Sequence, residues 1–232
     1  MSIAASTWLV TSYHAPYQAR VKRSLDVLLA AALLIVLSPL LLLISLVIVL
    51  DSGGPVLYRQ ERVGACRCRR GGRTYWSDRR FLILKFRTMA PDADSSPLHE
   101  QFVQSFVAGG RAEDGAFKLR DDPRVTRVGR FLRASSLDEL PQLLNVLRGT
   151  MSLVGPRPVP PYEVALYQPW QRERLASLPG ITGPWQVRGR GRVGFEEMVR
   201  LDIEYVRRQS VWLDLSLLAR TLPVVLAKRG AR

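Results

Sequence analysis

The sequence predicts a mainly helical α+β fold, in which a re-entrant membrane helix hairpin joins a cytosolic domain with a small β element and membrane-interface helices. Three observations indicate this fold. Residues 27–50 are apolar and uncharged but are interrupted by Ser38-Pro39. Two segments, 56–63 and 80–88, have the partial alternation and the aromatic or β-branched content typical of strands. From residue 124 onward the apolar residues recur at helical spacing.

The apolar run 27–50 contains a proline at its centre. Pro39 lacks an N–H and its ring clashes with the carbonyl of Ile35, so a helix kinks or breaks there. Each half alone is too short to cross a hydrocarbon core of about 30 Å. A kinked spanning helix and a re-entrant hairpin both fit this pattern. In either case the Ser38 hydroxyl is the nearest partner for the backbone groups freed at the break.

Basic residues flank the run on both sides. Arg20, Lys22 and Arg23 precede it, and Arg59 and Arg62 begin a longer basic series after it. Because basic flanks remain in the cytoplasm, this pattern favours a hairpin that enters and leaves on one side. A buried helix of a soluble protein is disfavoured, since the run has no polar face. The chain therefore divides into a tail at 1–19, the hairpin at 20–51 and a cytosolic domain at 52–232.

The cytosolic domain is expected to contain one small β element followed by helices. The basic, glycine-containing stretch 64–73 would connect the two strands. A helix is expected near 98–108 within a loop-rich region. Further helices are expected at 126–134, 137–148, 162–177, 195–208 and 211–228. The last of these is strongly apolar and ends in basic residues, which fits an interfacial helix and a core helix equally well.

Composition restricts the chemistry. The net charge of +14 predicts an anionic partner, such as nucleic acid, an acidic membrane or a phosphate-rich substrate. Cys66 and Cys68 form a C-x-C pair without further cysteines, which argues against a disulfide framework or a zinc site and leaves their role open. Only two histidines are present, so carboxylates must carry any acid–base or nucleophilic role.

The segment Ser135–Pro141 holds the acidic pair Asp138 and Glu139. Ser136 and Glu139 fit a capping box, so one interpretation of the pair is simply the start of a helix, and Pro141 offers a second register for that start. In both registers the carboxylates lie at a helix N-terminus, where anions are stabilised and backbone N–H groups suit a phosphate. The local pattern alone leaves the capping and the catalytic interpretations open.

Several basic or amide-bearing motifs are candidates for binding an anionic substrate. The turn Val154–Pro158 is stiffened by two prolines and contains Gly155 and Arg157, whose guanidinium suits a bidentate grip on phosphate. Each motif also has a plain alternative as a surface turn or a solvated face. The others are Lys85 and Arg87 at the end of a strand, the helical series Arg120, Arg124, Arg127, Arg130 and Arg133, and the rigid loop 179–186 with Gln186.

Taken together, these motifs resemble the bacterial sugar transferase family, the monotopic phosphoglycosyl transferases, and in particular its small members. The resemblance runs from about residue 22 to residue 222. It is carried, in order, by KRSLDVLL, the SP break, DSGGPVLYRQERVG, KFRTM, DPRVTRVGRFLRASSLDELPQLLNVLRGTMSLVGPRP, PGITGPWQVRGRG, and LDIEYV followed by WLDL.

The resemblance implies a covalent transfer reaction. Asp138 would be the nucleophile that attacks the β-phosphorus of a UDP-sugar, and Glu139 would help to hold Mg²⁺. Arg133 and Arg157 match family positions expected to bind phosphate. The acceptor would be a polyprenyl phosphate, with undecaprenyl phosphate as the expected species, and the product would initiate glycan or exopolysaccharide assembly. The enzyme would lie in the bacterial inner membrane, with its active site on the cytoplasmic face and without a nucleic-acid partner.

Some features leave alternatives open. The stretch 66–70 is more basic than the corresponding turn of the family, and the loop 90–122 is longer than in its smallest members, so the sugar and the pathway are not fixed. Homo-oligomerisation is also open. The rival of another class is a membrane-tethered basic module that binds nucleic acid or acidic lipid without catalysis. A second rival is a spanning transferase without a covalent intermediate.

Overall fold

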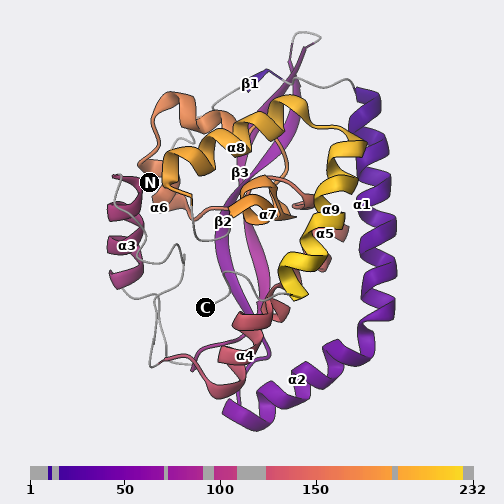
Figure 1. Cartoon of the computed structure of the whole chain (residues 1–232), viewed down its shortest axis with the longest axis vertical. Helices are drawn as coiled ribbons and strands as arrows, with labels where there is room; N and C mark the ends of the chain where they lie inside the picture. Colours follow the sequence, from indigo (N-terminus) through magenta and orange to yellow (C-terminus); the bar gives the residue numbers. More distant parts are fainter. Residues whose placement is uncertain are drawn as a thin grey trace.

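The computed structural model describes residues 10–11, 16–70, 73–90, 97–108, 124–189 and 193–226. It is a mixed, mainly helical fold, as predicted (Figure 1). Its elements are β1 (Val10–Thr11), α1 (Pro16–Val36), α2 (Ser38–Ser52), β2 (Leu57–Arg70), β3 (Arg73–Phe86), α3 (Pro97–Val107), α4 (Arg127–Ser135), η2 (Leu137–Glu139), α5 (Gln142–Leu147), β4 (Ser152–Val154), α6 (Pro161–Ala165), η3 (Pro169–Leu175), β5 (Gly180–Thr182), α7 (Pro184–Gly189), α8 (Phe195–Arg208) and α9 (Val211–Leu226).

The antiparallel pair β2–β3 runs along the length of the molecule, and α1 and α9 lie on one side of it (Figure 1). Its register extends from Leu57 opposite Phe86 to Arg70 opposite Arg73, and β1 pairs with β3 at its far end. The expectation that 64–73 only connects two short strands is therefore wrong. Buried Trp76 lies opposite Arg67, so the hairpin pairing with β3 extends β2 through a stretch whose own composition is basic. Cys66 and Cys68 are free thiols on β2.

Helices α1 and α2 are bent by 62° at a break that follows Val36. The Ser38 hydroxyl donates to the carbonyl of Ile35 at 2.7 Å, which confirms the expected partner at the break. Among the described residues, no single helix is long and apolar enough to cross a bilayer. The bent pair, taken together, has the length and the apolar composition to do so. Helix α1 begins at Pro16, inside the segment expected to be a tail.

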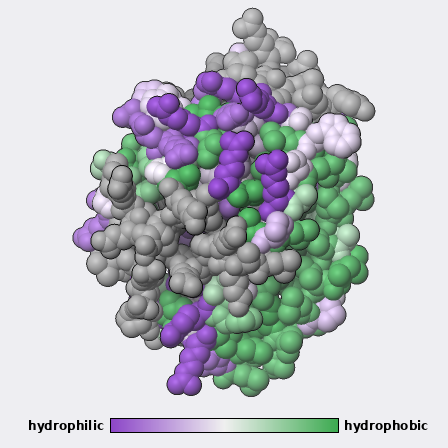
Figure 2. Space-filling view, in the orientation of Figure 1, coloured by the Kyte–Doolittle hydropathy of each residue, from purple (hydrophilic) through white to green (hydrophobic). Residues whose placement is uncertain are grey.

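The bent pair turns a broad apolar surface outward. Leu28, Ile35 and Val36 on α1 are each at least 67% exposed, and Leu42 and Leu50 on α2 are 72% and 76% exposed. Figure 2 shows this surface as a continuous apolar area along the side formed by α1 and α2. Such an area is far larger than the scattered apolar residues of an ordinary soluble surface.

The remaining helical predictions divide into confirmed and corrected ones. Helices α3, α4 and α8 match the expected segments closely. The expected helix 137–148 is split into η2 and α5, because Pro141 offers no N–H to continue it. The expected helix 162–177 is split into α6 and η3, because Pro169 holds Gln168 in an extended conformation.

The expected loop 179–186 is instead strand β5 followed by helix α7. Strand β5 pairs in parallel with β4, a partner distant in sequence that local patterns do not reveal. The last expected helix appears as α9, and residues 227–228 of that expectation lie outside the described residues.

The inner face of α2 packs against β3 and α4. Ile44 and Ile48 form a cluster with Phe86 of β3 and Leu132 of α4, and Leu137 and Leu140 pack against this cluster. Leu137 and Leu140 directly flank Asp138 and Glu139. The hairpin is therefore in contact with the turn that holds the acidic pair.

Candidate active site

The acidic pair lies on η2, a single 3₁₀ turn between α4 and α5. Ser136 is in the left-handed region with φ of 58° and serves as the C-cap of α4. Its side chain makes no capping hydrogen bond to η2, so the predicted capping box is wrong. Asp138 and Glu139 are buried, at 4% and 9% exposed. Two carboxylates this deeply buried need cationic or hydrogen-bonding neighbours.

Asn145 fixes this turn against the sheet. Its Oδ1 accepts from the N–H of Leu84 at 2.9 Å, and its Nδ2 donates to the carbonyl of Leu82 at 2.8 Å. Helix α5 is thereby held to one edge of β3, and the preceding turn with Glu139 is brought beside Lys85. Asn145 was not predicted as a functional residue. Its signal was an amide in the middle of a short helix whose other residues after Gln142 are apolar.

Lys85 and Glu139 form an ion pair, with Nζ to Oε1 at 3.4 Å and side chains 16% and 11% exposed. Burial lowers the pKa of Lys85, and the Glu139 carboxylate partly offsets this effect. The Asp138 carboxylate acts on the Lys85 pKa in the same direction as Glu139. Lys85 was predicted to bind an anionic substrate, and the structure pairs it with Glu139.

The turn after β4 presents Arg157. The Gly155 N–H donates to the Thr182 carbonyl at 2.9 Å, and the Gly180 N–H donates to the Pro156 carbonyl at 2.9 Å. A Cβ on Gly155 would collide with the carbonyl oxygen of Leu178, so only glycine allows this close approach. The turn that carries Arg157 is therefore fixed to β5 by backbone contacts.

A small pocket collects the predicted residues Lys85, Glu139, Arg157 and Gln186, together with Arg62 and Gln142. Arg62 and Gln142 were not predicted as site residues. Burial, reinforced by the positive charge of Arg157, lowers the pKa of Arg62 to about 10. Three cations thus surround a pocket beside two carboxylates.

The pocket also has polar atoms without protein partners. Arg62 donates from Nη2 to Gln60 and from Nη1 to the Pro158 carbonyl, whereas its Nε has no hydrogen-bond partner among the described residues. Gln186 donates from Nε2 to the Ile181 carbonyl at 3.2 Å, and its Oε1 likewise lacks a partner in the described part of the chain. Buried polar atoms of this kind suit a polar ligand.

Two predicted phosphate-binding residues lie elsewhere. Arg87 is buried at the end of β3 and donates to the Ser52 hydroxyl at 2.8 Å and to the Gly53 carbonyl, so it holds the C-terminus of α2. Arg133 is half-buried in the last turn of α4. Neither lines the pocket. Of the other arginines in the basic series, Arg127 and Arg130 are exposed, and Arg120 lies outside the described residues.

The carboxylates of the site fit one common mode of Mg²⁺ binding. Among the described residues, no group of three or more His, Cys, Asp or Glu side chains forms a metal cage. Mg²⁺, however, is commonly held by one or two carboxylates together with substrate phosphates and water. Asp138 and Glu139 supply two adjacent buried carboxylates, and cations line the neighbouring pocket, so the residues present fit that mode.

A bent pair of apolar helices near a buried carboxylate pair, beside a pocket lined by three cations, is an arrangement suited to an anionic substrate. A sequence profile of the bacterial sugar transferase family matches residues 17–228, and the chain belongs to this family.

The chain is similar to several curated relatives. It is 43% identical over 210 residues to the exopolysaccharide production protein ExoY of Sinorhizobium fredii, covering 90% of this chain and 87% of the relative. It is 44% identical over 218 residues to the UDP-glucose:undecaprenyl-phosphate glucose-1-phosphate transferase of Caulobacter vibrioides, covering 90% and 71%. It is 41% identical over 211 residues to the undecaprenyl-phosphate galactose phosphotransferase of Salmonella typhimurium, of which it spans only 41%.

Proposed function

We propose that the chain transfers a sugar 1-phosphate from a UDP-sugar to a polyprenyl phosphate, with undecaprenyl phosphate as the expected acceptor, and so initiates exopolysaccharide or other glycan assembly. The observation that carries the proposal is the buried pair Asp138–Glu139, of which Glu139 pairs with Lys85 in a pocket also lined by Arg62 and Arg157. The names of the relatives support the two substrates. Membership in a transferase family argues against the non-catalytic basic module.

The reaction divides into two displacements at one phosphorus. An Asp138 oxygen bonds to the β-phosphorus of the UDP-sugar, and the bond from that phosphorus to the bridging oxygen breaks, so UMP leaves with that oxygen. An oxygen of the polyprenyl phosphate then bonds to the same phosphorus and releases the Asp138 carboxylate. The product is a polyprenyl-diphosphate sugar. Carboxylate nucleophiles of this kind replace one difficult step by two easier ones.

The other residues stabilise charge and hold substrate. Lys85, Arg62 and Arg157 balance the negative charge of the diphosphate in a site that is largely shielded from water. Gln186 offers Oε1 to a donor on the sugar or the base. Mg²⁺, held by Glu139, would neutralise further diphosphate charge.

The membrane would supply the lipid substrate. We propose that α1 and α2 enter and leave the cytoplasmic leaflet of the inner membrane as a re-entrant hairpin, because the bent pair exposes a broad apolar surface. Since α2 packs against the residues that flank Asp138, this placement holds the carboxylate near the depth of a lipid phosphate. Cysteines introduced at Ser24 and Ser52 should react with a membrane-impermeant reagent from the same side, and labelling from opposite sides would contradict the hairpin.

Release of UMP tests the reaction. Purified protein is incubated with UDP-galactose or UDP-glucose, with and without undecaprenyl phosphate. A covalent route predicts a burst of no more than about one UMP per enzyme without the lipid, and continuous release with it. Continuous release that begins only with lipid, without any burst, would favour direct transfer. Absence of release across a wider panel of UDP-sugars would contradict the proposed function.

A further inference from the structure

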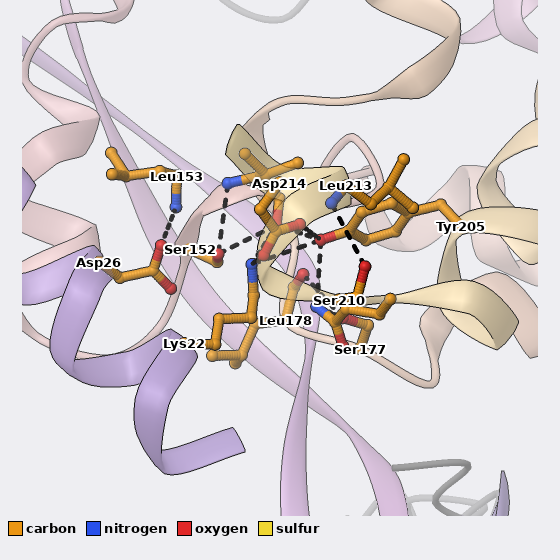
Figure 3. A network of polar contacts seen from close by, with 12 residues as sticks. Lys22, Asp26, Ser152, Leu153, Ser177, Leu178, Tyr205, Ser210, Leu213 and Asp214 are labelled. Atoms are coloured by element: carbon orange, nitrogen blue, oxygen red, sulfur yellow. Dashed lines mark hydrogen bonds and ion pairs between the residues drawn. The ribbon is translucent and has the colours of Figure 1, made fainter. Parts of the chain in front are cut away.

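A buried polar network joins α1 of the hairpin to β4, α8 and α9 (Figure 3). Lys22 Nζ lies 2.7 Å from Asp214 Oδ2, and the Tyr205 hydroxyl lies 2.7 Å from Asp214 Oδ1. The side chains of Lys22 and Asp214 are only 12% and 11% exposed. These residues belong to the sequence motifs KRSLDVLL, LDIEYV and WLDL, and of the three only Lys22 had a predicted role, in the basic flank of the apolar run.

The network meets strand β4 at its last residue. Lys22 Nζ lies 3.0 Å from the Val154 carbonyl oxygen, and the Tyr205 hydroxyl lies 2.9 Å from the same oxygen. One turn further along α1, Asp26 Oδ1 accepts from the N–H of Leu153 at 3.1 Å. Two consecutive residues of β4 are therefore held by side chains that come from α1 and α8.

Val154 directly precedes the turn that carries Arg157. Gly155 is enclosed by the backbone of Leu178 and Gly180, so the turn has little room to adjust independently. A displacement of the Val154 carbonyl would therefore pass along the turn to the Arg157 guanidinium. Even a small displacement matters for a charged group that must contact a diphosphate in a defined geometry.

Energetics also favours a positioning role. Desolvation of a buried ion pair cancels much of its attraction, so such a pair is weak support for stability. What it does supply is a defined geometry, since each of its charged groups has a small set of compatible partners. Here that geometry is centred on one carbonyl beside the phosphate-binding turn.

We infer that Lys22, Tyr205 and Asp214 are positioning residues. They hold the Gly155–Arg157 turn where Arg157 can bind the diphosphate of the nucleotide substrate, and they make the position of this turn depend on the position of α1. The inference rests on the proposed function. None of the three touches substrate, and all act through Val154 and Arg157.

The test measures the affinity for UDP by calorimetry on the full chain in detergent. Tyr205→Phe removes one hydroxyl and is expected to weaken UDP binding about tenfold. KM for the UDP-sugar should rise by a similar factor, with a smaller change in kcat. Lys22→Met should act in the same direction, and Lys22→Arg, which keeps the charge, should recover part of the affinity.

A double-mutant cycle separates positioning from loss of stability. In an Arg157→Gln background, Tyr205→Phe should cause no further loss of UDP affinity, because the group it positions is gone. Tyr167→Phe is the matched control. It removes the same hydroxyl from another buried tyrosine–carboxylate pair, whose hydrogen bonds go to Glu163 and Arg174 rather than to β4. It should lower the melting temperature while leaving UDP affinity unchanged.

Unchanged UDP affinity in both Tyr205→Phe and Lys22→Met would overturn the inference, and so would an additive loss in the Arg157→Gln background. Binding of UDP does not require turnover. A wild-type chain that binds UDP but releases no UMP would therefore contradict the proposed function alone, and the positioning test would still be decided by affinity.

Discussion

Two buried charged clusters in this protein differ in how tightly their members are paired. In the first, Arg174 lies 2.5 Å from Asp202 and 2.6 Å from the Tyr167 hydroxyl, and the side chains of Arg174 and Asp202 have no exposed surface. In the second, Lys85 lies 3.4 Å from Glu139, both side chains are partly exposed, and Arg62 and Arg157 line the same pocket.

The first cluster acts as a structural frame, because its charges pair with one another. The second cluster acts as a binding site, because its charges are available to a ligand. Short contacts around Arg174 join η3 to α8 and pair its guanidinium with carboxylates inside the protein, although Arg174 Nε and Asp202 Oδ1 have no hydrogen-bond partner among the described residues. Looser contacts around Lys85 leave room for anionic oxygens from a ligand. Variants in the Arg174 cluster should therefore cost stability, whereas variants in the Lys85 cluster should cost activity.

Asp138→Asn should have the largest effect. It removes the nucleophilic charge in a group of the same shape, so turnover should fall by at least about 10³-fold, with no labelled sugar phosphate trapped on the protein. UMP release and labelling measure this, with melting temperature as the control. Normal turnover of this variant would disprove the covalent route.

Asp202→Asn should be the largest change in stability. It leaves the Arg174 guanidinium buried without its closest charge partner, which is expected to cost about 3–5 kcal/mol in the free energy of unfolding. Denaturant unfolding measures this. Activity per folded molecule should stay near normal. A selective loss of kcat in fully folded protein would contradict the proposal that the Arg174 cluster supports stability and not activity.

Glu139→Gln should raise the Mg²⁺ concentration needed for half-maximal turnover by about tenfold, because a charged ligand is lost. It should also move the pH profile. Since Glu139 offsets the burial that lowers the pKa of Lys85, its removal lowers this pKa further. Lys85 then loses its proton at a lower pH. As the pH is raised, UDP affinity should therefore decline earlier in the variant than in the wild type. An unchanged metal titration would remove Glu139 from the metal role.

Arg62→Gln should weaken UDP binding about tenfold, because it removes one of three cations around the pocket. Stability should change little, since a desolvated charge beside Arg157 is also removed. Calorimetry and thermal melting measure the two effects. Loss of stability with unchanged UDP affinity would move Arg62 from the site to the frame.

Arg207→Gln should have the smallest effect. Arg207 and Glu173 form a close pair between α8 and η3, with Arg207 Nε 2.6 Å from Glu173 Oε1, but the Arg207 side chain is 57% exposed. Exposed pairs contribute about 0.2–1 kcal/mol. Unfolding should shift within that range and kinetics should not change. A larger shift would show that burial alone does not distinguish frame contacts from surface contacts.

Features with a local cause were predictable from the sequence. The break at Ser38-Pro39 follows from proline chemistry, and α8 follows from the spacing of its apolar residues. The family motifs led to Lys85, Glu139 and Arg157, which the structure does bring to one pocket. The strand residues 64–70 were missed because their basic composition conceals the hairpin pairing with β3, and β5 was missed because its partner β4 is distant in sequence.

Site residues defined by tertiary burial were harder to predict. Arg62 appears as one of many arginines in a basic stretch, and only its packing near Arg157 distinguishes it. Arg87 has the residue type of a phosphate ligand but faces the end of α2. The sequence pattern gives a side chain's charge, whereas the direction in which it points depends on contacts elsewhere in the chain.

The Asn145 amide has a consequence for association between molecules. The N–H of Leu84 and the carbonyl of Leu82 lie on the edge of β3 that does not pair with β2. Left open, such an edge is a template on which a strand of another chain can add, leading to aggregation. Asn145 occupies the donor and the acceptor together, as a neighbouring strand would. The Asn145 amide thus occupies this stretch of the β3 edge, against which α5 also packs, and leaves no place there for a strand of another chain.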